Sequence, residues 1–79
     1  MPLARYAGWP ESTLGNLAYI IMRESSGRQR ALNASSGCAG LLQILPSNVT
    51  QPWRLFDPEY NLRQGLRLYR LAGWSPWSL

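Results

Sequence analysis

Residues 14–22 carry apolar side chains at the spacing of a helix. They occupy the i, i+3, i+4, i+7 and i+8 positions of an amphipathic helix, namely Leu14, Leu17, Ala18, Ile21 and Met22. Ser12 or Thr13 can cap the start of this helix, and Gly27 is a helix-stop residue that follows it. The pattern predicts a helix that packs one face against a core.

A second helix is predicted between Asp57 and Gly73. Asp57 can serve as its N-cap, Pro58 takes the first helical position, and Glu59 lies in the first turn, where the helix dipole favours an anion. Gly73 would end it. The spacing predicts two faces, an apolar face of Leu62, Gly65, Leu66, Tyr69 and Ala72 and an arginine stripe of Arg63, Arg67 and Arg70.

The segment between these helices predicts shorter elements. Residues 26–40 are polar and small, which indicates a loop with one short helical turn around Ala31 and Leu32. Residues 41–45 form a short apolar element. A further short helix can begin at Pro46 and Ser47 and should end at Pro52.

The two ends of the chain show no helical periodicity. Residues 1–11 are expected to be an irregular lead-in, and residues 74–79 a short aromatic tail. The sequence contains no internal repeat and no convincing pair of strands. The predicted fold is therefore mainly α, a small helical domain with about three to five helices.

The composition bounds the domain and its chemistry. At 79 residues, with 46% hydrophobic and 15% charged side chains, the chain is expected to form one globular domain over residues 1–79. The single cysteine, Cys38, cannot form an internal disulfide. Because the chain has no histidine, a nucleophile–histidine pair is excluded and no metal site is expected.

The charge balance favours an anionic partner. All eight basic residues are arginine, and the net charge is +4. Nucleic acid, an anionic membrane surface and a bacterial cell wall all fit this charge, which does not choose among them. The N-terminal residues lack the features of a signal peptide, and no apolar run reaches the roughly 20 residues of a membrane span.

Glu24 is an unusual carboxylate. It is one of only four acidic residues, and it directly follows the most apolar stretch of the chain. At about 100° per residue it falls beside Leu17, at the edge of the buried stripe. Burial disfavours the ionised form of a carboxyl group, and a carboxylic acid that keeps its proton can protonate the leaving oxygen of a glycosidic bond. The simpler interpretation of the helix alone is a surface glutamate in its last turn.

Three motifs resemble the soluble lytic transglycosylase family. The family has a catalytic Glu-Ser pair at a helix end, matched by Glu24-Ser25, and then a Ser-x-Gly-Ala loop, matched by "SSGCAG". Its Gly-Leu-Met-Gln-Ile-x-Pro signature is matched by "GLLQILP" at 40–46. Its Asn-Pro…Asn-Ile…Gly helix is matched by "DPEYNL" at 57–62 and Gly65. The resemblance covers residues 14–73 and implies a lysozyme-like helical domain with a cleft.

The resemblance implies one catalytic residue, Glu24, and no metal or organic cofactor. Candidate substrate-binding residues are Ser25, Ser36, Gly40, Leu41, Gln43, Tyr60 and Tyr69. Asn61 is expected to be structural. Trp53, Trp74 and Trp77 could stack on sugar rings or fill the core. A later Ala-Tyr-Asn-Ala-Gly motif of many family members is missing, and "YRLAGWSPWSL" only echoes it.

The function expected from the resemblance is cleavage of peptidoglycan between MurNAc and GlcNAc, with formation of 1,6-anhydroMurNAc ends. Hydrolysis of the same bond by a muramidase is a variant. A noncatalytic wall-binding module and a basic nucleic-acid-binding protein are the alternatives, and nucleic acid is not the expected partner. The expected partner is the glycan strand, for a monomer or a domain of a larger parent. The expected location is the bacterial cell wall, periplasm or extracellular space, in an endolysin, a secreted protein or a phage particle.

Overall fold

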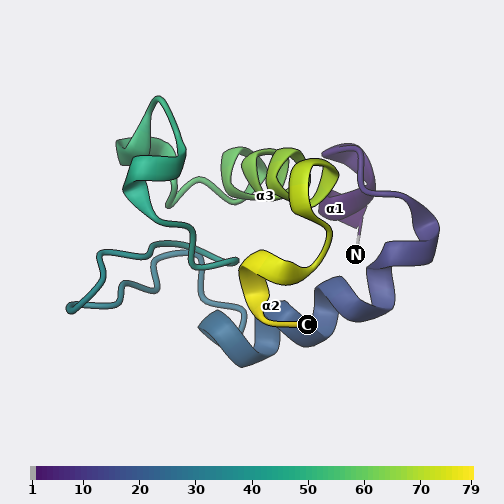
Figure 1. Cartoon of the computed structure of the whole chain (residues 1–79), viewed down its shortest axis with the longest axis horizontal. Coiled ribbons are helices and arrows are strands. Elements are labelled where there is room, and N and C mark those ends of the chain that lie inside the picture. Colours follow the sequence, from purple (N-terminus) through teal and green to yellow (C-terminus); the bar gives the residue numbers. More distant parts are fainter. Residues whose placement is uncertain (1) are drawn as a thin grey trace.

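The computed structural model describes residues 2–79 and is mainly helical, as predicted (Figure 1). Its three α-helices are α1 (Pro2–Tyr6), α2 (Leu14–Ser25) and α3 (Pro58–Ala72). Four single 3₁₀ turns complete it, η1 (Glu11–Thr13), η2 (Pro46–Asn48), η3 (Pro52–Arg54) and η4 (Ser75–Trp77). Residues 2–79 contain no strand, only isolated bridges that pair Ala39 with Leu32 and with Ile44. None of the helices in this range is long and apolar enough to cross a membrane.

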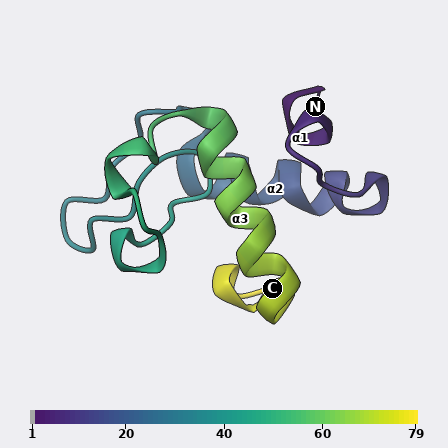
Figure 2. The same ribbon diagram turned by 90° about the horizontal axis from the view of Figure 1, so that it is seen from above.

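The C-terminal turn lies between the two long helices. In Figure 1, η4 (yellow) occupies the space between α3 above and α2 below, and η4 contacts α3 directly. The segment that joins α2 to α3 forms a lobe on one side of the molecule, at the left of Figures 1 and 2. Helix α1 packs against α3 at the other side.

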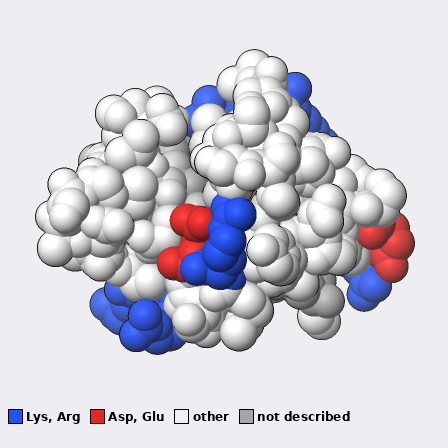
Figure 3. All heavy atoms as spheres, turned by 60° about the horizontal axis from the view of Figure 1, so that its bottom comes forward, with Lys and Arg blue, Asp and Glu red and all other residues white. Residues whose placement is uncertain are grey.

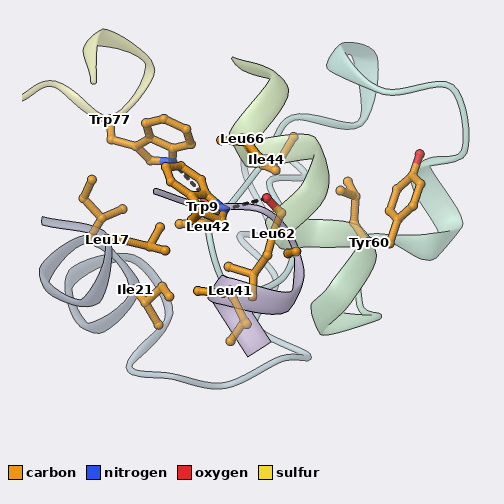
Figure 4. Close-up of a cluster of buried hydrophobic side chains, with 14 of the residues drawn as sticks. Trp9, Leu17, Ile21, Leu41, Leu42, Ile44, Tyr60, Leu62, Leu66 and Trp77 are labelled. Carbon is orange, nitrogen blue, oxygen red and sulfur yellow. Dashed lines mark hydrogen bonds between the residues drawn. The ribbon is translucent and has the colours of Figure 1, made fainter. Parts of the chain in front are cut away.

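The core is built where these parts meet (Figure 4). Its buried apolar side chains come from α2, α3, the 39–44 segment and both ends of the chain, and they include Leu17, Ile20, Leu42, Leu62, Leu66, Trp9 and Trp77. Each buried tryptophan also donates a hydrogen bond to a distant carbonyl. Trp9 Nε1 lies 2.8 Å from the oxygen of Leu62, and Trp77 Nε1 lies 2.9 Å from that of Leu42. These bonds fix the N-terminal segment to α3 and the C-terminal turn to the 39–44 segment.

The start and end of α3 agree with the sequence prediction. The Asp57 carboxylate accepts hydrogen bonds from the backbone N–H groups of Glu59 and Tyr60, and Pro58 takes the first helical position. Gly73 follows the last residue with φ +62°. Leu62, Gly65 and Leu66 face the core, and the three arginines of the stripe are exposed.

Helix α2 is present but its buried face differs from the prediction. Leu17 and Ile21 are buried as expected, whereas Met22 is 62% exposed and Ile20 is fully buried in its place. The predicted side-chain cap is also wrong. Thr13 Oγ1 donates to the carbonyl of Pro10 instead of accepting from the helix, because η1 runs directly into α2.

The terminal segments were predicted wrongly. Residues 1–11 are not an irregular lead-in over their described part, because Pro2–Tyr6 forms α1, and Ala4, Ala7 and Trp9 are buried. Residues 74–79 are more than a tail, because η4 buries Trp77. Helices of five and three residues, the lengths of α1 and η4, have too few positions to reveal a period.

Two details of the middle segment were also wrong. No helical turn forms at Ala31 and Leu32, where Leu32 instead makes a β-bridge to Ala39. Pro52 does not end a helix but begins η3, since a proline is accepted at the first position of a turn.

Candidate active site

Glu24 lies in the last turn of α2 and is partly enclosed. Its side chain is 28% exposed, and its Oε2 lies 3.0 Å from Nε of Arg23. The same guanidinium donates through Nη2 to the backbone carbonyl of Trp77, and its Cζ lies 5.9 Å from the ring centre of Tyr19. Arg23 therefore connects the Glu24 carboxylate to the C-terminal turn. Acidic and basic side chains meet at the centre of the face drawn in Figure 3, between larger areas of uncharged surface.

The chain turns away immediately after Glu24. Ser25 is buried, and its Oγ donates to the carbonyl of Ile21 and accepts from the N–H of Gly27. Ser26 takes the left-handed conformation with φ +55° and ends the helix. Ser25 thus fixes the helix end that carries Glu24, and its hydroxyl is turned inward.

The 39–44 segment is held tightly beneath α3. Gly40 is buried with φ +80°, and a Cβ there would lie 2.2 Å from both Nδ2 of Asn61 and the carbonyl oxygen of Leu55. Only glycine fits this position. Its N–H donates to the carbonyl of Ala31 over 2.8 Å, which ties the loop that follows α2 to this segment.

Asn61 is structural, as expected. It is fully buried, its Oδ1 accepts from the N–H of Leu42 at 3.0 Å, and its Nδ2 donates to the carbonyls of Ala39 at 2.9 Å and Leu55 at 3.0 Å. One side chain of α3 therefore satisfies three backbone groups of the loops packed on it.

Gln43 is the predicted binding residue that reaches a hollow. Its backbone takes φ +50°, and its Nε2 donates to the carbonyls of Ala31 and Gly40, each at 3.0 Å. With Cys38 and Trp77 it lines a hollow of about 100 Å³. Among the described residues its Oε1 has no hydrogen-bond partner, which leaves an acceptor for a ligand N–H or O–H group.

The structure assigns packing contacts to most other predicted binding residues. Leu41 is buried, and Tyr60 is buried with its hydroxyl accepting from the N–H of Gln51 at 3.2 Å. Tyr69 packs its ring against Trp9 and Trp74, with ring centres 5.4 and 4.6 Å apart.

Ser36 lies on the surface, in the turn that precedes Cys38. Its hydroxyl accepts from the N–H of Cys38. Among the described residues, no hydrogen bond joins Ser36 to Glu24 or Gln43.

The other three carboxylates already have partners. Glu11 is 72% exposed and pairs with Arg5 at 2.7 Å, and the hydrogen bond and charge of Arg5 hold the pKa of this carboxyl below its usual range. Glu59 is 41% exposed and pairs with Arg63 at 2.8 Å, and Asp57 caps α3. Among residues 2–79, Glu24 is thus the only acidic residue that lies in the last turn of a helix and is connected to the C-terminal turn, through Arg23.

Sequence reasoning missed Arg23 and the full contribution of Trp77. An arginine next to a glutamate in a helix carries no signal of its own, because adjacent residues do not face each other in an ideal helix. A larger hollow of about 430 Å³, lined by Ser47, Asn48, Val49, Thr50, Gln64 and Arg67, was also not predicted. It depends on how the 46–50 segment folds back on α3.

Comparison with known proteins gave one match. The sequence profile of the family described as Transglycosylase SLT domain matches residues 3–71. No curated protein and no solved structure matches the chain.

Proposed function

The chain belongs to the transglycosylase SLT domain family, whose members act on peptidoglycan, and we propose that it cleaves the MurNAc–GlcNAc β-1,4 bond with Glu24 as its one catalytic residue. The proposed products carry 1,6-anhydroMurNAc ends. The proposed place of action is the bacterial cell wall. The proposal includes no metal or organic cofactor.

The position of Glu24 carries this proposal. Its carboxylate, which pairs with Arg23, is 28% exposed at the helix end, whereas Glu59 and Glu11 are 41% and 72% exposed in their ion pairs and Asp57 caps α3. A two-carboxylate glycosidase needs a second acid across the scissile bond. Transfer to a hydroxyl of the substrate itself needs only one group that gives and takes a proton, and Glu24, paired with Arg23 at the partly enclosed helix end, is the acid that fits this role.

In the first proposed step, the carboxylic acid of Glu24 gives its proton to the glycosidic oxygen. The bond from MurNAc C1 to that oxygen breaks, and GlcNAc leaves with a hydroxyl group. The carbonyl oxygen of the MurNAc N-acetyl group bonds to C1 as the leaving group departs, forming a cyclic oxazolinium intermediate. Glu24 is then a carboxylate, and the Arg23 guanidinium at 3.0 Å stabilises that charge.

In the second proposed step, the C6 hydroxyl of the same MurNAc attacks C1. The bond from C1 to the N-acetyl oxygen breaks, and the hydroxyl proton passes to the Glu24 carboxylate. Glu24 ends in its starting state and no water is consumed. Water attack at C1 would give a reducing end instead, which is the hydrolase variant of the same chemistry.

Glu24→Gln tests this role. General acid–base groups typically contribute about 10²–10⁴-fold, so the variant should release soluble muropeptides from purified peptidoglycan at least about 100-fold more slowly. Glu11→Gln is the matched control, since it removes an exposed carboxylate that lies in η1. Equal release by wild type and Glu24→Gln would contradict the proposal. Wall binding without release by either protein would favour a noncatalytic module.

A further inference from the structure

Arg23 holds one oxygen of the Glu24 carboxylate and leaves the other open. The Nε–H group of Arg23 donates to Oε2 of Glu24 at 3.0 Å. Among the described residues, Oε1 of Glu24 accepts no hydrogen bond. A carboxylic acid carries its proton on one oxygen and can still accept a hydrogen bond through the other. Because an N–H donor already faces Oε2, the oxygen available to carry a proton is Oε1.

Arg23 is itself held from two further sides. Its Nη2 donates to the backbone carbonyl of Trp77, and its Cζ lies 5.9 Å from the ring centre of Tyr19. Trp77 is buried, and its indole N–H donates to the carbonyl of Leu42 at 2.9 Å. The carbonyl that receives Arg23 therefore belongs to a turn that is fixed to the core, the turn η4 that lies between α2 and α3 in Figure 1. A guanidinium bonded through two of its nitrogens has a defined orientation, unlike that of a single exposed ion pair.

Arg63 makes the same three kinds of contact elsewhere in the fold. It pairs with Glu59 at 2.8 Å, its Nη2 donates to the carbonyl of Tyr6 at 3.4 Å, and its Cζ lies 5.5 Å from the ring centre of that tyrosine. The carboxylates differ, because Glu59 is 41% exposed in the first turn of α3 and Glu24 is 28% exposed in the last turn of α2. Removal of Arg63 therefore takes away an equivalent set of contacts without touching Glu24.

We propose that Arg23 is a positioning residue for the reaction, which fixes Oε2 of Glu24 against the C-terminal turn so that Oε1 faces the substrate and carries the proton. This inference rests on the proposed function. In the first step Oε1 gives its proton to the glycosidic oxygen, and in the second step it receives the proton of the C6 hydroxyl. Arg23 keeps its own protons and its bond to Oε2 throughout. The turn η4 thereby supports the catalytic carboxylate through Arg23.

Removal of Arg23 should slow the reaction without weakening substrate binding. With soluble strands of uncross-linked peptidoglycan as substrate, Arg23→Ala should lower kcat about 10- to 100-fold, because a loosely held acid reaches the reactive geometry less often. The value of kcat/KM should fall by the same factor and KM should not change, since Arg23 acts through Glu24 and not on the substrate. Rates are compared per folded molecule, with the folded fraction taken from circular-dichroism melts.

Guanidinium ions should restore activity to this variant. The Arg23 side chain is 34% exposed, so a guanidinium ion can enter the vacated space from solvent and donate to Oε2. Millimolar guanidinium chloride should therefore raise the kcat of Arg23→Ala, whereas sodium chloride at the same concentration should not. Glu24→Gln should gain nothing from either salt. Such a rescue separates a lost hydrogen-bond donor from a damaged fold, which guanidinium would weaken further.

Arg63→Ala is the matched control, and it should keep the wild-type kcat per folded molecule. An Arg23→Ala variant with the wild-type kcat would overturn the proposal, and so would an equal loss of kcat in Arg63→Ala. A loss that guanidinium does not reverse would mean that Arg23 only holds the fold. A loss that sodium chloride reverses equally well would mean that ionic strength alone matters. Both of these results also overturn the proposal.

The contact to Glu24 can be tested without any turnover. In an NMR hydrogen-exchange experiment, the Nε–H signal of Arg23 should exchange more slowly with water than that of Arg30, which is exposed in the loop after α2. This protection should be lost in Glu24→Ala. Exchange as fast as that of Arg30 in the wild type would overturn the proposal, whatever the activity. A protected signal in a protein that releases nothing from walls would support the held carboxylate and contradict the proposed function.

Discussion

Asn61→Ala should cost a large part of the stability of this domain. The side chain is fully buried and bonds the N–H of Leu42 and the carbonyls of Ala39 and Leu55. After truncation, the Leu42 and Leu55 groups lose their only partners among the described residues, whereas the Ala39 carbonyl still accepts from Ile44. Each buried group left without a partner costs about 1–3 kcal/mol, so for these two groups we expect a loss of about 2–6 kcal/mol.

That loss is large for a chain of this size. At roughly 0.05–0.15 kcal/mol per residue, the free energy of unfolding is about 4–12 kcal/mol. Since about 1 kcal/mol shifts the midpoint of a small domain by roughly 4–8 °C, the variant should melt at least about 8 °C lower or be unfolded at room temperature. Thermal and urea melts followed by circular dichroism measure both quantities.

Two further variants make the Asn61 prediction specific. Asn61→Asp keeps the bond from Leu42 but turns a carboxylate oxygen toward the two carbonyls, so it should be destabilised at least as strongly. Asn16→Ala, at an exposed position of α2, should melt at or slightly above the wild-type temperature because alanine is the better helix former. An Asn61→Ala melt within 1 °C of wild type would refute the claim that this side chain holds the loops.

Three other predictions concern the supports of the site. Gly40→Ala should prevent folding, since its Cβ would lie 2.2 Å from two other atoms. Gly27→Ala, at φ +77° in open space, should cost only about 1–2 kcal/mol. Circular-dichroism melts compare the two variants, and equal melts would contradict this difference. Trp77→Phe removes both the buried hydrogen bond to Leu42 and the pyrrole part of the buried indole, so a urea titration should show a loss of at least about 1–2 kcal/mol. No loss would refute the role of this side chain. The hydrogen bond and charge of Arg5 lower the pKa of the Glu11 carboxyl in the folded protein. This carboxyl therefore stabilises the fold at pH values above its pKa in the unfolded chain. The contribution is lost as the pH falls through its pKa in the folded protein. An NMR titration should show that pKa rise in Arg5→Gln, and an unchanged pKa would exclude Arg5 as the cause.

The sequence predicted the elements whose signals are local. The cap at Asp57, the proline after it and the glycine at 73 are neighbours in the chain, and α3 begins and ends where they indicate. Asn61 could be recognised as structural only through the family resemblance. Its three partners lie 6 to 22 positions away, and the fold alone brings them together.

The sequence failed where long-range contacts decide the structure. Trp9 and Trp77 are 68 positions apart, yet both are buried and hydrogen-bonded to distant carbonyls, and neither burial could be read from a short terminal segment. The same applies to α2, where the contacts of the other elements select Ile20 for the core and leave Met22 outside.

The candidate site was predicted in part. The position of Glu24 at a helix end is correct, and Gln43 reaches a hollow. Gly40, Leu41 and Tyr60 are buried in the packing behind the site, so any effect they have on substrate would act through the loop that they hold. Arg23 was missed, because its contact to Trp77 joins α2 to the other end of the chain.

The mass of the soluble products tests the central claim most directly. Purified peptidoglycan is digested with wild type and with Glu24→Gln, and the released muropeptides are analysed by mass spectrometry. The account predicts fragments one water lighter than the reducing-end forms, made by wild type and absent with the variant. Ordinary reducing ends from wild type would contradict attack by the sugar hydroxyl, and the lighter fragments from Glu24→Gln at the wild-type rate would contradict the role of Glu24.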